Sequence, residues 1–274
     1  VVVLAGASIS VAYLGVVGSV TATIGFGTSL TIALYPRLLS GGDERDIAAV
    51  LRMVLMFIIP ASFGIVWLSE PLLALFRPDY LTARVPLYIS VFASFIGVMD
   101  GIVSLSLMGI EKVDIAERVS FKDFRKSALF TLPSLSLSSL VFYLPLVATL
   151  STAFRGDQLQ LAIAWSLLSL TVGAVVFAVK LIYSRKRIQL RFPIWDISKY
   201  VASSLFMTGV VSAVWRGMDY SDPILLLISR IAPTIIAGTV SYFTVLYLMD
   251  PELRRMADEI VKYLRLRRQE SLHR

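Results

Sequence analysis

Long apolar runs, separated by short polar stretches, dominate the sequence. A membrane-spanning helix needs about 20 consecutive, mainly apolar residues. Runs of that length predict seven full spans, at residues 14–37, 50–69, 84–110, 127–151, 160–184, 197–216 and 223–249. A transmembrane β-barrel would instead show segments of about 10 residues with alternating polarity. The pattern therefore predicts an all-α, polytopic transmembrane helix bundle.

The composition supports a membrane protein and narrows its chemistry. Hydrophobic residues make up 57 % of the 274 positions and charged residues 16 %, whereas a soluble domain is about half apolar and about a quarter charged. The sequence contains no cysteine, and its only histidine is His273, in the tail. Disulfides, thiolate metal sites and an intramembrane histidine relay are thereby excluded. We expect no cofactor, no metal site and no catalytic group, and hence no enzyme.

The N-terminal segment is longer than one span requires. The first 36 residues carry no charge, and as one helix they would extend about 54 Å, although the bilayer core is only about 30 Å thick. We therefore predict a turn near Leu14 and Gly15, with residues 1–13 as the end of a preceding transmembrane helix. The sequence begins with Val1 and lacks the charged start of a signal peptide. This suggests a chain that starts partway through a larger protein.

The lysines and arginines predict the orientation in the membrane. Only four of the 26 fall in the loops assigned to one side: Arg77, Arg84, Arg155 and Arg216. Nearly all the others lie in the tail and in the loops assigned to the opposite side. Membrane proteins carry an excess of lysine and arginine in their cytoplasmic loops, so this opposite side is predicted to be the cytoplasm. The C-terminus is therefore predicted to be cytoplasmic, in a plasma membrane. Anionic lipid accounts for the basic charge, so a nucleic-acid partner is not needed.

Residues 250–274 read as a cytoplasmic amphipathic helix and tail. Asp250 can cap the helix and Pro251 suits its first position. Apolar residues then recur on one helical face with basic residues around the rest, which is typical of a helix lying on the membrane surface. A charged, solvated tail helix is the alternative.

Asp100 and Arg230 are charged residues that lie well inside predicted spans, away from the span ends. A central Asp costs about 2.5–3.5 kcal/mol to insert. We therefore expect Asp100 to face the bundle interior or a cavity and to contact a polar partner on another helix. Arg230 is the candidate partner because its depth is compatible, although it could instead extend to the outer interface. Asp100 could also be a structural acid that is protonated or bonded to hydroxyls.

Small and hydroxyl residues form two stripes at helical spacing. Gly18, Ala22, Gly25 and Ser29 share a face of the first span, where we predict close helix packing. Hydroxyls share a face at the start of the fourth span: Ser127, Thr131, Ser134 and Ser138. This second stripe either bonds to neighbouring helices or lines a wet cavity for a hydroxyl-rich ligand such as a sugar.

Four prolines interrupt the spans: Pro60, Pro133, Pro145 and Pro233. Membrane helices tolerate proline where neighbours or cavity water satisfy the freed carbonyls, and transporters use such breaks as bending points or ligand sites. Proline is also simply commoner in membrane helices than in soluble ones. The four positions are therefore candidates for helix breaks.

Several stretches resemble the C-terminal portion of polysaccharide flippases, the Wzx-type O-antigen and lipid-linked oligosaccharide transporters. These stretches are "ALYPRLLS" (33–40), "IIPASFGIVWLSEPLLALF" (58–76), "SLSLMGIEK" (104–112), "VASSLFMTGVVSAV" (201–214) and "AGTVSYFTVLYLMDPELRR" (237–255). The same superfamily, the multidrug/oligosaccharidyl-lipid/polysaccharide exporters, holds the multidrug extruders. The resemblance implies one lobe of a two-lobe flippase at residues 14–184 and two extra helices at 185–249, with the N-terminal lobe missing. No residue role is carried over, because no family motif matches Asp100 or Arg230.

The resemblance implies a transporter that flips a lipid-linked oligosaccharide or polysaccharide repeat unit across the cytoplasmic membrane. Its partners would be the bilayer, the lipid-linked glycan, a coupling ion (H⁺ or Na⁺) and the missing lobe. Hydroxyl and arginine side chains facing a large cavity would favour this function, whereas an acid that exchanges a proton or Na⁺ would favour a multidrug/cation antiporter. A seven-helix receptor-like protein is a more distant alternative.

Overall fold

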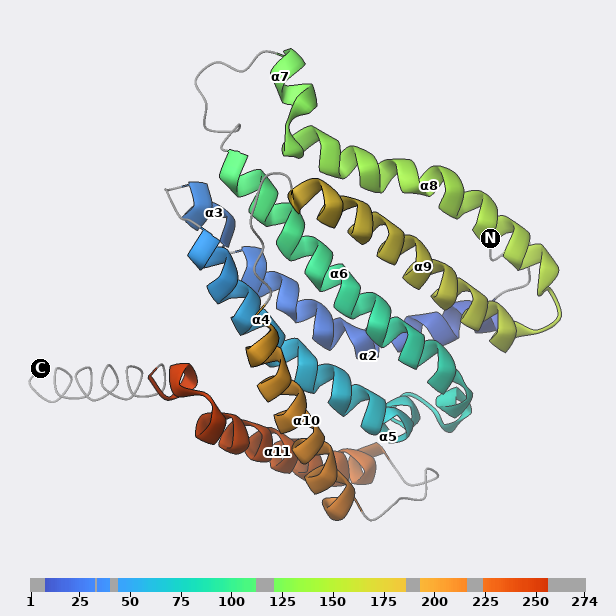
Figure 1. Cartoon of the computed structure of the whole chain (residues 1–274). Coiled ribbons are helices and arrows are strands. Elements are labelled where there is room, and N and C mark those ends of the chain that lie inside the picture. Colours follow the sequence, from blue (N-terminus) through green and yellow to red (C-terminus); the bar gives the residue numbers. More distant parts are fainter. Residues whose placement is uncertain are drawn as a thin grey trace, which may run out of the picture.

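The computed structural model describes residues 8–32, 34–39, 44–111, 121–185, 193–215 and 224–255, and the regular structure within these ranges is helical. Seven long helices are apolar enough to cross a membrane. They are α2 (Ser8–Ile32), α4 (Glu44–Trp67), α6 (Arg84–Glu111), α8 (Ala128–Ala153), α9 (Gln158–Arg185), α10 (Ile194–Val214) and α11 (Ile224–Met249), all shown in Figure 1. The predicted all-α polytopic bundle is confirmed.

Short helices lie between or beside the long ones. They are α3 (Leu34–Leu39), α5 (Ser69–Ala74), the 3₁₀ helix η1 (Pro78–Ala83) and α7 (Phe121–Lys126). The turn between α8 and α9 ends at Asp157, whose Oδ1 accepts hydrogen bonds from the backbone N–H groups of Leu159 and Gln160. This side-chain cap satisfies two donors that a helix start leaves free and fixes where α9 begins.

The helix α6 lies at the centre of the bundle and packs against α2, α4 and α9, while α8 covers the outer side of α9. The helices α10 and α11 pair with each other at the opposite end, where α10 rests on α4 (Figure 1). Fully buried side chains between α2, α4 and α6 form the core, among them Ile24, Leu55, Ile58 and Ile102. Large apolar side chains remain exposed on α8, as expected of a surface that faces lipid.

The turn predicted near Leu14 and Gly15 is wrong. The helix α2 has 25 residues and runs unbroken through both positions, so it is about 37 Å long. The excess length of the uncharged segment is instead taken up at the other end, where α2 ends at Ile32 and α3 begins at Leu34. Residues 8–13 therefore belong to the same helix as 14–32, and residues 1–7 lie outside the described ranges.

The prediction that the small-residue stripe of the first span packs against a neighbour is also wrong for the described helices. Gly18 and Gly25 are exposed, and a Cβ added to either would meet nothing within 4 Å. The close approach occurs instead at Gly27, where an added Cβ would lie 2.6 Å from Ile58 Cγ2 and 3.2 Å from Val98 Cγ1. Gly27 was not part of the stripe because it lies on a different face of the helix.

The predicted helix start at Asp250 is confirmed. Asp250 Oδ1 accepts a hydrogen bond of 3.0 Å from the backbone N–H of Glu252, and residues 251–255 are helical. The remainder of the predicted amphipathic tail, residues 256–274, lies outside the described ranges.

Candidate functional site

An ion pair that contains a nearly inaccessible lysine joins α6 to α9. Lys180 Nζ donates to Asp100 Oδ2 at 2.7 Å and to Ser104 Oγ at 3.3 Å. The Lys180 side chain is 4 % exposed and that of Asp100 is 27 % exposed. Asp100 therefore has the polar partner on another helix that its position requires.

Helix geometry explains why these three groups meet. Asp100 and Ser104 are four residues apart, so they lie on the same face of α6. Lys180 is five residues before the end of α9, and helical side chains are directed toward the N-terminus of their helix. The long side chain of Lys180 thus extends away from the end of α9 and reaches the level in the bundle at which Asp100 lies. A lone charge at that depth costs several kcal/mol, and the pair with its hydroxyl offsets part of that cost.

The partner of Asp100 in the structure is Lys180, and the predicted partner, Arg230, is wrong. Arg230 is exposed on α11, and Figure 1 shows α4 between α11 and α6. Lys180 lies inside the predicted span at 160–184, but the sequence analysis did not single it out, because it was counted with the cations of the loop that follows. A lysine inside an otherwise apolar run was the signal that could have identified the pair.

The hydroxyl stripe gives a mixed result. Ser127 is buried and its Oγ donates to the backbone oxygen of Phe124 at 2.6 Å, while exposed Ser138 donates to that of Leu135 at 2.8 Å. Both hydroxyls therefore bond to backbone near them in sequence. Thr131 and Ser134 are half-buried on α8. A role of these four residues or of Arg230 in a substrate pathway stays a prediction.

None of the four candidate prolines ends its helix. Pro60 lies inside α4, Pro133 and Pro145 inside α8, and Pro233 inside α11. A proline leaves the carbonyl four residues earlier without its helical donor, so Pro60 frees the carbonyl of Met56. Tyr242 on α11 donates its hydroxyl to that oxygen at 2.7 Å, which is the substitute partner that a proline in a membrane helix needs.

An apolar groove of about 470 Å³ lies between α2, α4, α5, α10 and α11. Pro60, Gly64, Met207, Gly238 and Tyr242 are among its lining residues, together with several Leu and Phe side chains. The groove depends on a close approach of α10 and α11, because a Cβ added to Gly238 would lie 2.8 Å from Val211 Cγ2. Its walls suit a hydrocarbon chain much better than a sugar or an ion.

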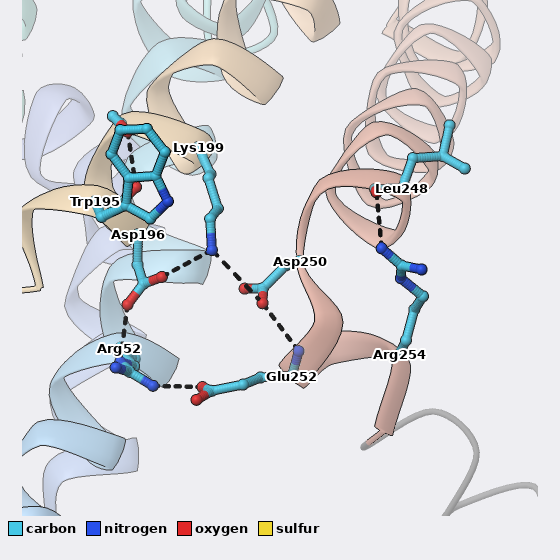
Figure 2. Close-up of polar contacts among 9 residues, drawn as sticks. Arg52, Trp195, Asp196, Lys199, Leu248, Asp250, Glu252 and Arg254 are labelled. Carbon is cyan, nitrogen blue, oxygen red and sulfur yellow. Dashed lines mark hydrogen bonds and ion pairs between the residues drawn. The ribbon is translucent and has the colours of Figure 1, made fainter.

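A second set of charges lies where α4 and α10 begin and α11 ends; we call it the end network. Arg52 pairs with Asp196, at 2.9 Å, and with Glu252, while Lys199 lies 3.0 Å from Asp196 and 3.9 Å from Asp250 (Figure 2). The sequence analysis missed this network because its members come from three separate segments. Only Asp250 had been noticed, as a cap.

A polar end pocket of about 340 Å³ adjoins the end network. Its lining includes Arg45, Arg52, Tyr200, Asp250 and Glu252, with Met53 and Met56 on its apolar side. Within the described ranges, no group of three or more His, Cys, Asp or Glu residues could hold a metal ion. The features that the described residues do present are a buried ion pair, an apolar groove and a charged helix end.

The comparisons with known proteins bear on the fold. No family model matches the sequence, and no curated protein matches it. A solved structure, the lipid II flippase MurJ in an inward closed conformation, is similar with a TM-score of 0.56 and 17 % sequence identity. The likeness covers 88 % of this chain and 48 % of the MurJ chain. The chain therefore has the fold of about half of that flippase, and at this identity the likeness extends to the fold alone.

Proposed function

We propose that the chain is one lobe, with two additional helices, of a flippase that carries a lipid-linked oligosaccharide or polysaccharide unit across the cytoplasmic membrane. The observation that carries the proposal is the fold shared with about half of a lipid II flippase. A two-lobe transporter alternates access by moving one repeat against the other. The missing lobe is thus a partner in the proposal, and the C-terminus is placed in the cytoplasm because of the distribution of lysine and arginine.

The apolar groove supports a lipid-linked substrate. Such a substrate joins a polar glycan to a long hydrocarbon chain, and the chain has to remain in an apolar environment while the glycan crosses. The groove between α4, α10 and α11 offers that environment beside Pro60, Gly64 and Tyr242. Moving apolar surface out of water contributes about 25 cal/mol per Å². The hydrocarbon chain of this substrate already lies in lipid, so it gains little of this energy by entering the groove. The fit between the shapes of the chain and the groove therefore matters more.

The ion pair in the interior supports the second candidate, a multidrug/cation antiporter. Asp100 contacts the ammonium of Lys180, and an intramembrane acid is a group that can exchange a proton or Na⁺ during transport. In a flippase the same pair would serve as the site of the coupling ion. The two candidates therefore differ in what the apolar groove holds: the chain of a glycolipid or a hydrophobic cation.

A competition experiment separates the two candidates. The protein is placed in lipid nanodiscs together with a polyprenyl-pyrophosphoryl oligosaccharide that carries a photoreactive group on its hydrocarbon chain. The sample is irradiated, and the cross-linked peptides are identified. We expect cross-links at the groove that unlabelled lipid-linked oligosaccharide suppresses and that ethidium does not. Suppression by ethidium alone would favour the antiporter. Cross-links that neither competitor suppresses would contradict a lipid-linked substrate.

A further inference from the structure

One buried hydrogen bond connects the middle of α4 to α11. The hydroxyl of Tyr242 donates to the backbone oxygen of Met56 at 2.7 Å, and Tyr242 is 1 % exposed. Pro60, four residues after Met56, has no N–H to offer this oxygen, so the helix itself supplies no donor to it. A carbonyl left without a partner inside a membrane costs several kcal/mol, so Pro60 creates a demand that Tyr242 meets.

The hydrogen bond lies at the boundary between two cavities. The ring of Tyr242 lines the apolar groove together with Phe57 and Pro60, whereas Met56 lines the polar end pocket together with Arg52 and Tyr200. Phe57 and Pro60 follow Met56 on α4, so the groove begins where the end pocket stops. The contact between Tyr242 and Met56 thus separates a charged cavity at the helix ends from an apolar cavity inside the bundle.

The helix α11 touches α4 directly at few points. It packs mainly on α10, and its contacts with α4 are sparse (Figure 1). Beside the Tyr242 hydrogen bond, Phe243 packs against Phe57 with ring centroids 6.0 Å apart. Just beyond the end of α11, Glu252 pairs with Arg52. Because α11 touches α4 directly at so few places, the loss of one of these contacts changes how α11 lies against α4.

We propose that the Tyr242–Met56 hydrogen bond is a gate between the polar end pocket and the apolar groove. While the bond is made, α11 lies against α4 and the groove is closed toward the helix ends. When the bond opens, the two cavities join into one path with a charged mouth and an apolar interior. Pro60 belongs to the gate because it keeps the Met56 oxygen free for a partner on another helix. The gate is independent of the substrate that the groove holds.

The chain has no cysteine, so one introduced thiol reports on the gate without background. Ala61, a small half-buried residue of α4 that lines the groove, is changed to cysteine. The protein is placed in lipid nanodiscs and treated with a charged, water-soluble maleimide. Because lipid shields the outer faces of the helices, the labelling rate measures access from water, and a difference between the parent and a variant at Tyr242 reports on the end-pocket side of the groove.

Tyr242→Phe keeps the ring and removes the hydroxyl, and we expect the labelling rate to rise by about five-fold, the effect of losing one net hydrogen bond. Pro60→Ala should raise the rate as well, because the new N–H of residue 60 competes with Tyr242 for the Met56 oxygen and weakens the bond to Tyr242. The double variant should label no faster than Pro60→Ala alone. Since Pro60→Ala restores the hydrogen-bond ladder of α4, faster labelling in that variant cannot come from unfolding of α4.

Tyr247→Phe is the matched control, because Tyr247 lies on the same helix but is exposed. It should leave the labelling rate unchanged. The gate is contradicted if Tyr242→Phe and Pro60→Ala label at the parent rate. It is equally contradicted if their effects add, or if Tyr247→Phe raises the rate as much as Tyr242→Phe does.

Discussion

Ion pairs occur at two depths in this molecule, and they differ in what surrounds them. The Asp100–Lys180 pair lies between α6 and α9 within the apolar bundle, and Lys180 is nearly inaccessible. The end network lies where helices begin and end. Its Arg52 and Glu252 side chains are substantially exposed, whereas those of Lys199, Asp196 and Asp250 are largely buried. The first contact is a single pair with one hydroxyl, whereas the second shares several charges among three segments.

The difference shows which contacts the fold depends on. Removing one partner of a buried pair leaves an uncompensated charge in an apolar interior and costs about 3–5 kcal/mol. An exposed pair contributes about 0–1 kcal/mol and is weakened by salt. The interior pair therefore constrains the bundle strongly, whereas the Arg52–Glu252 pair is the exposed, easily separated part of the end network.

The largest expected effect comes from breaking the interior pair on one side. Lys180→Met keeps the length of the side chain and removes its charge, which leaves Asp100 without its cation. We expect thermal unfolding in detergent to show a loss of about 3 kcal/mol. The double change Asp100→Asn with Lys180→Met should recover most of that loss, because no unpaired charge remains. A double variant as unstable as the single one would show that the pair is not the cause.

The packing around the interior is expected to be the next most sensitive feature. Gly27→Val would place a side chain where the Cβ alone already meets Ile58 at 2.6 Å, and overpacking costs about 1–3 kcal/mol. Gly25→Val on the exposed face of α2 is the matched control, because an added Cβ there meets nothing. Both variants are compared by thermal unfolding. Equal losses would contradict the packing of α2 against α4 and α6.

Breaking the end network should have a smaller effect that depends on salt. Arg52→Ala removes both of its ion pairs, and we expect a loss of about 1 kcal/mol at low salt. At about 1 M salt the variant and the parent should converge, because screening already weakens exposed pairs. The difference between Lys180→Met and its parent should persist at the same salt concentration. A salt-independent Arg52 effect would show that the network is as shielded as the interior pair.

The smallest effect tests the hydroxyl beside the interior pair. Ser104→Ala removes an acceptor 3.3 Å from Lys180 Nζ, and interhelical polar contacts in membranes contribute about 0.6 kcal/mol on average. Ser138→Ala, whose hydroxyl bonds within its own helix, should be close to neutral. A thermal unfolding comparison in which Ser138→Ala loses more than Ser104→Ala would reverse this assignment.

The sequence was sufficient for the number, order and approximate bounds of the spans, because each needs a long apolar run and those runs are unambiguous. It also identified Asp100 as a residue that needs a partner. It could not identify Lys180 as that partner, since depth along a helix does not show which helices touch. Gly27 and the end network escaped notice for a related reason. Close approaches and multi-segment charge clusters depend on how helices are arranged, and the apolar runs contain little information about that arrangement.

The central claim is that this lobe recognises a lipid-linked glycan, and selective binding tests it most directly. Native mass spectrometry of the detergent-solubilised chain, given equal amounts of a polyprenyl-pyrophosphoryl oligosaccharide and of a polyprenyl phosphate with the same hydrocarbon chain, measures which one is retained. The account predicts preferential retention of the lipid-linked oligosaccharide, because its glycan makes polar contacts with the protein in addition to the contacts that the hydrocarbon chain makes. Equal retention of the two lipids, or retention of neither, would contradict the claim.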